Sequence, residues 1–501
     1  MSPLLNNISQ LSQEAVQEFK KAAQTPIPND ELAKAGVTVA SNFTAYDLQA
    51  PAKNLFPVLT PIRNSTPRVS GGGGPATNWK KVLGINTASL RGFVPEGGRN
   101  GVVTTRAVDA SAPYKAFGLE DSITFEAELA AKGFEDIRST QAQRLLWAAM
   151  IEEELANIGA NLSVDLGTPT APTVVAADAD GGTIAADAGG YACRVVALTH
   201  AGYLASSLSS GVVQQVSVTP ADGGAAFTYG GGSSMKSDAT VSGATAGGAS
   251  TLKLSTPVVA GAVAYAWYVG AHDGDVTLQA ITTINSVKLL SLSNTHQNVT
   301  AITADYSKNT LGYDGLLYHA WTSASGAYIK NMATGSAGTG TGLTSNTVGG
   351  IVEIDDMFRS MWDNYRISPT SLYVNAQEAD NITKKVLSAS AAQLQYVTSG
   401  EFSSGSRVKA LLNRFAMNAA PEVPVKIHPN MPPGTVLAVT EQLPYPINGV
   451  PNVFEMRLRR DYYQMEWPMR TRKYETGVYF DGVLAHYFPP SLGIITNITN
   501  A

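Results

Sequence analysis

Three consecutive glutamates, Glu152-Glu153-Glu154, are grouped closely enough to suggest acid–base catalysis. They lie within residues 135–158, where apolar residues recur at steps of three and four, which predicts an amphipathic helix. Successive residues of a helix point about 100° apart, so three adjacent carboxylates cannot converge on one substrate atom. We expect a solvated helix face, with salt bridges to arginines of a neighbouring subunit as the alternative and catalysis as the least favoured interpretation.

Metal-binding and nucleophilic residues do not have the spacing of an active site. The six histidines are His200, His272, His296, His319, His428 and His486. No two of them form the closely spaced pair of a zinc enzyme, so we expect structural histidines whose hydrogen bonds are satisfied. The single cysteine, Cys193, is expected to be buried in a strand, and Asp273 and Asp275 to form a turn rather than a calcium loop. Since no G-x-S-x-G motif occurs either, the sequence predicts no catalytic residues, no cofactor, no metal site and no enzymatic activity.

The run GGGGPATNWK, residues 71–80, raises the question of a phosphate-binding loop. Such loops need a lysine beside the last glycine and a following Ser or Thr that holds magnesium. Here Lys80 and Lys81 lie further along the chain and are followed by Val-Leu-Gly. We therefore interpret Gly71 to Gly74 as a flexible hinge or a tight crossing of the chain.

The charge is distributed unevenly along the 501 residues. Residues 162–306 contain four basic residues and nine aspartates, which accounts for the whole net charge of −5. The basic residues near 457–473 alternate with acidic ones, a mixture that favours contacts between subunits over a nucleic-acid groove. No apolar run is long enough to cross a bilayer, and the first twenty residues do not have the pattern of a secretory signal.

The first 160 residues predict an arm, a long hairpin and a long helix. Residues 9–23 have helical spacing and are followed by an extended, proline-rich stretch through Pro61. Residues 67–119 are strand-like, and VPEGGRNG at 94–101 predicts a hairpin turn with glycines in left-handed conformations. The helix is expected to begin at the cap Asp136 and to end at Gly159. Its expected buried stripe consists of Ile137, Gln141, Leu145, Ala148, Ile151, Leu155 and Ile158.

Residues 162–306 predict an all-β sandwich, because short strands alternate with turn residues and no helical period occurs. The expected strands are 191–198, 211–218, 250–255, 262–270 and 276–283. The segments PTAP and AYAWYVGAHDG resemble those of a fibronectin-type-III or immunoglobulin-like module.

After Tyr306 both helices and strands are expected again. A helix is predicted over 351–365, and residues 371–387 read as a strand that runs into a helix with an Asn375/Glu378 capping box. Later strands are predicted at 423–427, 435–439, 453–459 and 477–488. The fold class is therefore α+β, interrupted by the β-rich segment.

The order of these parts resembles the major capsid protein of tailed bacteriophages, a fold shared with encapsulin shells. The stretches that carry the resemblance are TPRVSGGGGPATNW (66–79), GFVPEGGRNG (92–101), FEDIRSTQAQRLLWAAMIEEELANIG (134–159), GGIVEIDDMFRSMWDNYRISPTSLYVNAQEADNI (349–382) and RRDYYQMEWPMRTRKYETGVYFDGVLAHYFP (459–489). The resemblance implies an N-terminal arm at 1–66, an E-loop at 67–120 and the spine helix of the P domain at 121–161. An inserted sandwich at 162–306 is expected to follow. The remaining chain is expected to form a P-domain continuation at 307–348, an A domain at 349–450 and closing strands at 451–501.

The resemblance implies a structural shell subunit assembled in a bacterial cytoplasm and located in the virion. Its implied partners are copies of itself in hexamers and pentamers, a portal, scaffolding or decoration proteins, and packaged double-stranded DNA bound without sequence specificity. No membrane contact is implied. The alternatives are an encapsulin-like compartment and, with the β-sandwich as its only argument, a surface adhesin or carbohydrate-binding protein.

Overall fold

The computed structural model describes residues 37–40, 43–46, 57–85, 91–132, 136–347, 349–387, 408–416, 422–443 and 451–500. The helix expected at 9–23 lies outside this part of the chain. Two compact units are present: residues 1–57 with 123–140, and residues 58–122 with 141–501.

The first unit contains a short hairpin and the start of the long helix. Strands β1 (Val37–Ala40) and β2 (Phe43–Tyr46) pair antiparallel. Thr124 caps α4 (Phe125–Ala131) by accepting a hydrogen bond from the Ala127 amide. The Asp136 carboxylate accepts one from the amide of Ser139 at 3.3 Å, which confirms the predicted start of α5 (Ile137–Gly159).

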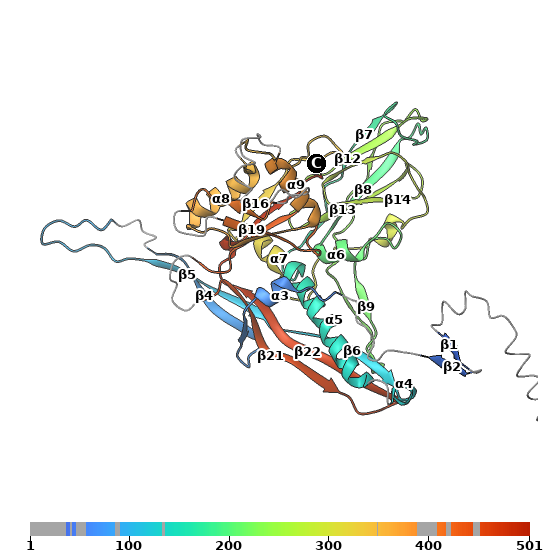
Figure 1. Ribbon diagram of the computed structural model, residues 1–501. Coiled ribbons are helices and arrows are strands. Elements are labelled where there is room, and N and C mark those ends of the chain that lie inside the picture. Colours follow the sequence, from blue (N-terminus) through green and yellow to red (C-terminus); the bar gives the residue numbers. More distant parts are fainter. Residues whose placement is uncertain are drawn as a thin grey trace, which may run out of the picture. The chain divides into compact units, whose positions relative to one another are not determined.

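A four-stranded sheet lies at the base of the second unit, in the order β3-β21-β22-β6 (Figure 1). Its strands are β3 (Arg68–Ser70), β21 (Phe454–Glu466), β22 (Lys473–His486) and β6 (Lys115–Thr124). The alternating residues Phe454, Met456 and Leu458 are buried on one face of β21, as the period of a strand requires. Leu145 and Ala149 of α5 pack against Val478 on the same sheet.

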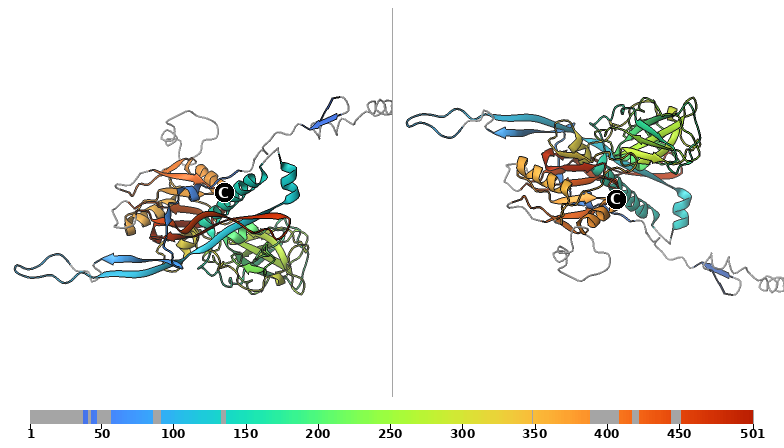
Figure 2. Two further views of the ribbon diagram at one scale, coloured as in Figure 1. Left: turned by 90° about the horizontal axis from the view of Figure 1, so that it is seen from below. Right: turned by 90° about the horizontal axis from the view of Figure 1, so that it is seen from above.

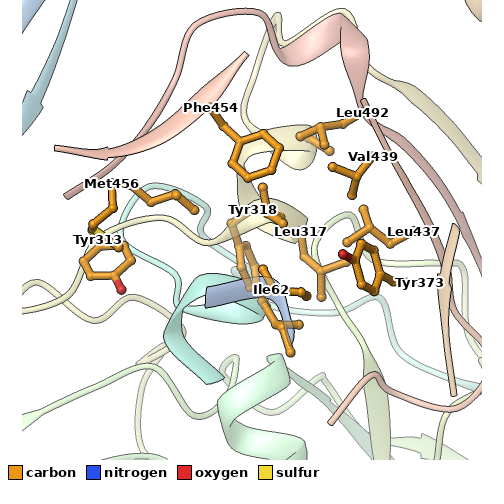
Figure 3. Packing of buried hydrophobic residues seen from close by; sticks show 14 of the residues in the cluster. Ile62, Tyr313, Leu317, Tyr318, Tyr373, Leu437, Val439, Phe454, Met456 and Leu492 are labelled. Atoms are coloured by element: carbon orange, nitrogen blue, oxygen red, sulfur yellow. The ribbon is translucent and has the colours of Figure 1, made fainter. Parts of the chain in front are cut away.

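The core above this sheet gathers side chains from distant parts of the chain. The helix α3 (Pro61–Ser65) was not predicted and begins at the last residue of the stretch expected to be extended; it contributes Ile62. Ile62 packs with Leu317 and Tyr318 of α7 (Leu316–Trp321) in the cluster that also contains Phe454 (Figure 3). Thr60 followed by Pro61, a proline at the first helical position, was the sequence signal for α3.

A six-stranded mixed sheet has the order β16-β23-β20-β17-β19-β18. Its strands are β16 (Tyr328–Asn331), β23 (Gly493–Thr496), β20 (Val436–Val439), β17 (Ser371–Val374), β19 (Glu422–Ile427) and β18 (Ala410–Leu412). β23 pairs with β16 in parallel and with β20 antiparallel, so it lies inside the sheet. The 3₁₀ turn Pro489–Ser491 precedes β23.

Two predicted helices pack with this sheet. α8 (Val352–Tyr365) buries Ile354, Phe358 and Met361 in the core that the sheet shares, as its helical spacing predicts. α9 (Ala376–Leu387) follows β17, as predicted. The capping box is wrong in part: Asn375 accepts a hydrogen bond from the Gln377 amide, whereas buried Glu378 accepts one from the Gly434 amide at 3.0 Å.

Residues 162–306 contain two sheets that share one hydrophobic core. One has the order β11-β8-β13-β14 and the other β15-β12-β7. These strands are β7 (Thr173–Ala177), β8 (Tyr191–Leu198), β11 (Thr240–Val241), β12 (Thr251–Ser255), β13 (Ala264–Ala271), β14 (Thr277–Thr282) and β15 (Ser286–Leu289). Trp267 of β13 and Leu252 of β12 meet in this core.

The strand predicted at 211–218 is wrong over its first half. Only β9 (Val216–Val218) is a strand, and it pairs with β10 (Phe227–Tyr229) in a separate two-stranded sheet. The short helices of this region are α6 (His200–Ala205) and the 3₁₀ turn Val299–Ala301.

The two-sheet region is joined to the six-stranded sheet by a buried pair of asparagines. The Asn497 side-chain amide donates to Asn285 Oδ1 at 3.0 Å, and Asn497 Oδ1 accepts from the main-chain amide of Asn285 at 2.7 Å. Asn497 has a left-handed backbone with a φ of 62°, one residue after β23. Residues 162–306 are therefore also fixed to the sheet by side-chain contacts away from the two ends of the segment.

A two-stranded hairpin extends from the second unit, and Figure 2 shows it in two further views. β4 (Ala76–Ile85) and β5 (Thr105–Pro113) pair antiparallel from Ala76↔Pro113 to Ile85↔Thr105. The predicted hairpin is confirmed, but it is shorter than 67–119, because the flanking β3 and β6 belong to the four-stranded sheet. Gly97 of its loop has a φ of 72°, as predicted, whereas the left-handed conformation predicted for Gly98 and Gly101 is wrong.

Candidate functional site

Glu153 lies at the centre of a buried charge network near the end of α5. Its side chain is fully buried and accepts from Arg63 Nε at 2.7 Å and from Arg68 Nη1 at 2.5 Å. The Tyr462 hydroxyl donates to it at 2.6 Å, and Arg68 also pairs with Asp461 at 2.7 Å. Burial, followed by the nearby Glu153 charge, raises the pKa of Tyr462, so this hydroxyl stays a donor. The network joins α5 to α3, β3 and β21.

Glu154 caps the short helix α3 from another element. Its two oxygens accept from the amides of Ile62 at 2.9 Å and Arg63 at 2.6 Å, which lie in the first turn of α3. Thr60, at the cap position, provides no side-chain hydrogen bond of its own. A carboxylate at a helix N-terminus satisfies amides that lack helical partners and complements the helix dipole. Glu154 therefore replaces the missing cap and fixes α3 to α5.

His428 completes the second half of the network. Its Nε2 lies 2.7 Å from Glu154 Oε1, and its Nδ1 accepts from the Asn430 amide at 3.1 Å. Because Nδ1 is an acceptor, the imidazole is neutral and donates its Nε2 proton to the carboxylate. Each carboxylate oxygen of Glu154 thus has at least one donor within the fold.

The prediction that the three glutamates form a solvated face is wrong for two of them. Glu152 is exposed, but Glu153 and Glu154 are fully buried. The alternative, arginine pairing, is present within this chain through Arg63 and Arg68. The buried face of α5 passes through Ala149, Glu153 and Asn157, so the predicted Ala148, Ile151 and Leu155 are only partly buried.

The histidines are brought into pairs that the sequence does not reveal. His200 Nε2 lies 2.7 Å from the Asn430 carbonyl, beside His428. Gly159 packs so closely on the His200 ring that a Cβ there would lie 2.3 Å from Nδ1, so this glycine permits a close approach in addition to ending α5.

His319 and His486 form the second pair, with ring centroids 5.5 Å apart. His319 donates to the Leu484 carbonyl at 3.1 Å. Within the described residues neither ring nitrogen of His486 has a hydrogen-bond partner, which differs from the expectation of satisfied histidines. Its ring is stacked on Phe454.

The other candidate residues have structural positions. Cys193 is buried, as predicted, and burial raises the pKa of its thiol to about 12, which makes it a poor nucleophile. Asp275 accepts from Asn298 after a turn in which Gly274 donates to Ala271, as expected for HDGD. Among the described residues, no cluster of three or more His, Cys, Asp or Glu could hold a metal ion. No helix in the same residues is long and apolar enough to cross a membrane.

The arginines of β21 form contacts within the chain. Arg457 pairs with Glu455 at 3.1 Å and Arg459 with Asp481 at 3.4 Å. Arg460 lies over the Tyr463 ring, 4.1 Å from its centroid. These three cations therefore have local partners in the folded chain.

The four glycines at 71–74 differ from one another. The Gly71 amide donates to the Leu458 carbonyl, and a Cβ at Gly71 would lie 2.0 Å from the Tyr114 hydroxyl oxygen. No atom outside the immediate neighbours lies within 4 Å of the Cβ position of Gly72 or Gly73. The run therefore combines a tight crossing at Gly71, one of the two interpretations that the sequence allowed, with open positions at Gly72 and Gly73.

Gly71→Ala is expected to destabilise the folded chain by about 1–3 kcal/mol, because the methyl group must displace Tyr114. Gly72→Ala and Gly73→Ala are expected to change the free energy of unfolding by less than about 0.5 kcal/mol. Urea denaturation of the three variants measures the difference, and equal effects at Gly71 and Gly72 would contradict the close crossing.

The β4–β5 hairpin carries apolar side chains that nothing in the described chain covers. Phe93 is 96% exposed, Val102 86% and Ile85 72%, and Val82 and Val108 are also exposed. All residues from 91 to 109 are exposed, so neither face of the outer hairpin packs on the body. The base of the hairpin contacts the rest of the chain through Trp79, whose ring packs edge-on against Tyr487 with the ring centroids 5.3 Å apart.

No protein-family model matches this sequence, and no curated protein sequence matches it. Solved structures similar to this chain include capsid and compartment shells. The capsid of a native GTA particle has a TM-score of 0.39 at 8% identity, covering 90% of this chain and 95% of that one. The capsid of Myoviridae phage XM1 has a TM-score of 0.38 at 10% identity, covering 92% and 99%. The SrpI encapsulin of Synechococcus elongatus PCC 7942 has a TM-score of 0.36 at 10% identity, covering 90% and 94%.

Proposed function

We propose that this protein is a structural shell subunit, the major capsid protein of an icosahedral phage head that encloses double-stranded DNA. The observation that carries the proposal is the exposed apolar β4–β5 hairpin. An isolated two-stranded hairpin is marginally stable in water, and contiguous exposed apolar side chains are typical of interaction surfaces. The hairpin therefore needs a partner that covers Phe93, Val102 and Ile85.

Charge favours a second copy of the chain as that partner. Residues 76–113 contain five basic and two acidic residues, a net charge of +3, so the rest of the chain carries −8. A basic hairpin is attracted to the acidic body of another copy. Because the hairpin and the surface that receives it are different parts of the chain, the contact is head-to-tail. Such a contact forms rings, as in pentamers and hexamers, when the rotation between neighbours closes.

The buried network is suited to a subunit that bears load. Glu153 and Glu154 join α3, α5, β3, β21 and the His428 segment, so a force on one of these elements is shared with the others. In this proposal residues 307–348 and 349–450 correspond to the P and A domains. The two-sheet region, an immunoglobulin-like insertion, faces outwards because the nine aspartates of 162–306 keep it in solvent. A portal, scaffolding or decoration proteins and packaged DNA are the further partners.

The test is assembly of a hairpin variant. The wild-type chain and Phe93→Asp/Val102→Asp are expressed alone and compared by sedimentation and negative-stain electron microscopy. We expect closed shells or rings of five and six from the wild type, and a 52.6 kDa monomer from the variant. Two buried charges in an apolar contact are expected to weaken assembly by at least about tenfold.

Val175→Asp is the matched control, because Val175 is an equally apolar, exposed residue of β7 in the two-sheet region. It should assemble normally, and all three proteins should unfold at the same denaturant concentration. Full assembly of the hairpin variant would contradict the proposal. Shells that contain protein cargo and no DNA, when isolated from the natural host, would favour an encapsulin-like compartment instead.

A further inference from the structure

The tip of the hairpin contains Asn100 followed by Gly101. Among the described residues, Asn100 is the only asparagine followed by glycine. Its side-chain amide donates to the Arg91 carbonyl at 2.6 Å, and its Oδ1 accepts from the Gly101 amide at 2.8 Å. The side-chain amide is thus oriented with its carbonyl towards the next peptide nitrogen.

This arrangement brings two reactive groups together. The Gly101 amide donates to the oxygen attached to Asn100 Cγ, so the nitrogen lies beside the side-chain amide, and rotation of the exposed side chain brings Cγ to face this nitrogen. Glycine has no Cβ to hinder the approach of its own nitrogen. The positive charges of Arg91 and Arg99 favour loss of the amide proton, which makes the nitrogen a nucleophile. Water reaches the site, because every residue of 91–109 is exposed.

We propose that Asn100 is a site of spontaneous deamidation through a succinimide. The Gly101 nitrogen forms a bond to Asn100 Cγ, the Cγ–Nδ2 bond breaks, and ammonia leaves with the proton that the Gly101 amide lost. Water then opens the five-membered imide at either carbonyl. One opening gives aspartate, and the other gives a β-linked isoaspartate in which the main chain runs through the former side chain. No oxidant, reductant or enzyme takes part.

Both products change the surface that the proposed function assigns to assembly. The hairpin loses one unit of positive charge, from +3 to +2, and the β-linked product lengthens the tip by one backbone carbon. This part of the inference rests on the proposed function. A docked tip would exclude water and fix the backbone, so assembly should suppress the reaction, and modified subunits should assemble less well.

The experiment follows the reaction at the residue. The unassembled full-length chain is incubated at neutral and at mildly alkaline pH, cleaved after glutamate, and the 97–120 peptide is analysed by liquid chromatography and mass spectrometry. We expect a fraction with an acid in place of the amide, resolved into two isomers, that grows with time and faster at the higher pH. A synthetic GGRNGVV peptide incubated in parallel shows that the conditions permit the reaction.

Two variants provide the controls. Asn100→Gln would need a six-membered imide and is expected to lose the modification, and Gly101→Ala is expected to slow it by hindering the nitrogen. If the peptide reacts but Asn100 in the protein stays unmodified, the proposal that Asn100 is a deamidation site is wrong. If Asn100 is modified at equal rates in the assembled and the unassembled chain, the expected protection by docking is wrong. The deamidation site itself is then still supported. Particle formation itself is scored separately by microscopy, so failure of the shell proposal is distinguished from failure of the chemistry.

Discussion

Replacing Glu153 by alanine is expected to lower the free energy of unfolding by about 3–5 kcal/mol, because it leaves two arginines without their buried partner. Arg63 and Arg68 are held by this carboxylate at 2.7 and 2.5 Å, and both lie over the Tyr462 ring. Loss of the carboxylate also deprives the Tyr462 hydroxyl of its acceptor. Urea denaturation followed by tryptophan fluorescence measures the change.

Glu152→Ala is the matched control, since it is the same substitution one residue earlier on the same helix. Glu152 is exposed, and its loss should change the free energy of unfolding by no more than about 0.5 kcal/mol. Equal effects of the two substitutions would show that the network contributes nothing beyond helix propensity. Glu153→Gln should lower the free energy of unfolding by an intermediate amount, because glutamine keeps an acceptor oxygen for the arginines but removes the negative charge.

Acid is expected to destabilise the second unit at pH values where most carboxylates are still ionised. Burial lowers the pKa of His200 from 6.5 to about 4, an effect only partly offset by its hydrogen bond to Asn430. Burial also lowers the pKa of His319 and of His486, and in His486 the neighbouring His319 and Lys81 lower it further. The unfolded chain therefore takes up protons below pH 6.5 that the folded chain does not.

This difference in protonation determines the direction and the size of the change in the free energy of unfolding with pH. The stability that these histidines contribute is complete above pH 6.5 and is lost as the pH falls towards their folded pKa. Each group contributes a slope of up to about 1.4 kcal/mol per pH unit, so His200 alone accounts for about 3 kcal/mol between pH 6.5 and 4. Denaturation curves between pH 7.5 and 5 isolate this effect, because ordinary carboxylates titrate near about pH 4.

His486→Phe tests the assignment. The phenyl ring keeps the stacking on Phe454 and loses no hydrogen bond that the described structure provides. We expect the free energy of unfolding of this variant to fall less steeply with decreasing pH below 6.5 than that of the wild type. At pH 7.5 its free energy of unfolding should be unchanged or higher. His272→Phe, at an exposed turn, should leave the slope as it is. An unchanged slope in His486→Phe would mean that His486 does not contribute to the acid response.

Local signals predicted the elements well where neighbours in the sequence determine them. The cap Asp136 at the start of α5, the left-handed turn glycine Gly97 and the helical spacing of α8 each depend on a few neighbouring residues, so the sequence alone predicted them. The helix α3 was missed even though Thr60-Pro61 is a helix start, because a proline-rich context suggested an extended chain.

The buried network could not be predicted, since its members are far apart in the sequence. Glu154 meets Ile62 across 92 residues and His428 across 274. A glutamate at the end of an amphipathic helix has the same local pattern whether it faces water or an arginine. Helical period alone placed the buried stripe at Ala148 and Leu155, whereas the compensating cations shift it to Ala149 and Glu153.

The position of β23 has a consequence for how the chain folds during synthesis. This strand completes ladders with β16, about 165 residues earlier, and with β20, about 58 residues earlier. Until residues 493–496 leave the ribosome, the facing edges of β16 and β20 have no partner, and such edges are prone to pair with other chains. Contacts of this sequence separation also fold slowly. Nascent chains of this protein are therefore expected to depend on chaperones until the sheet closes.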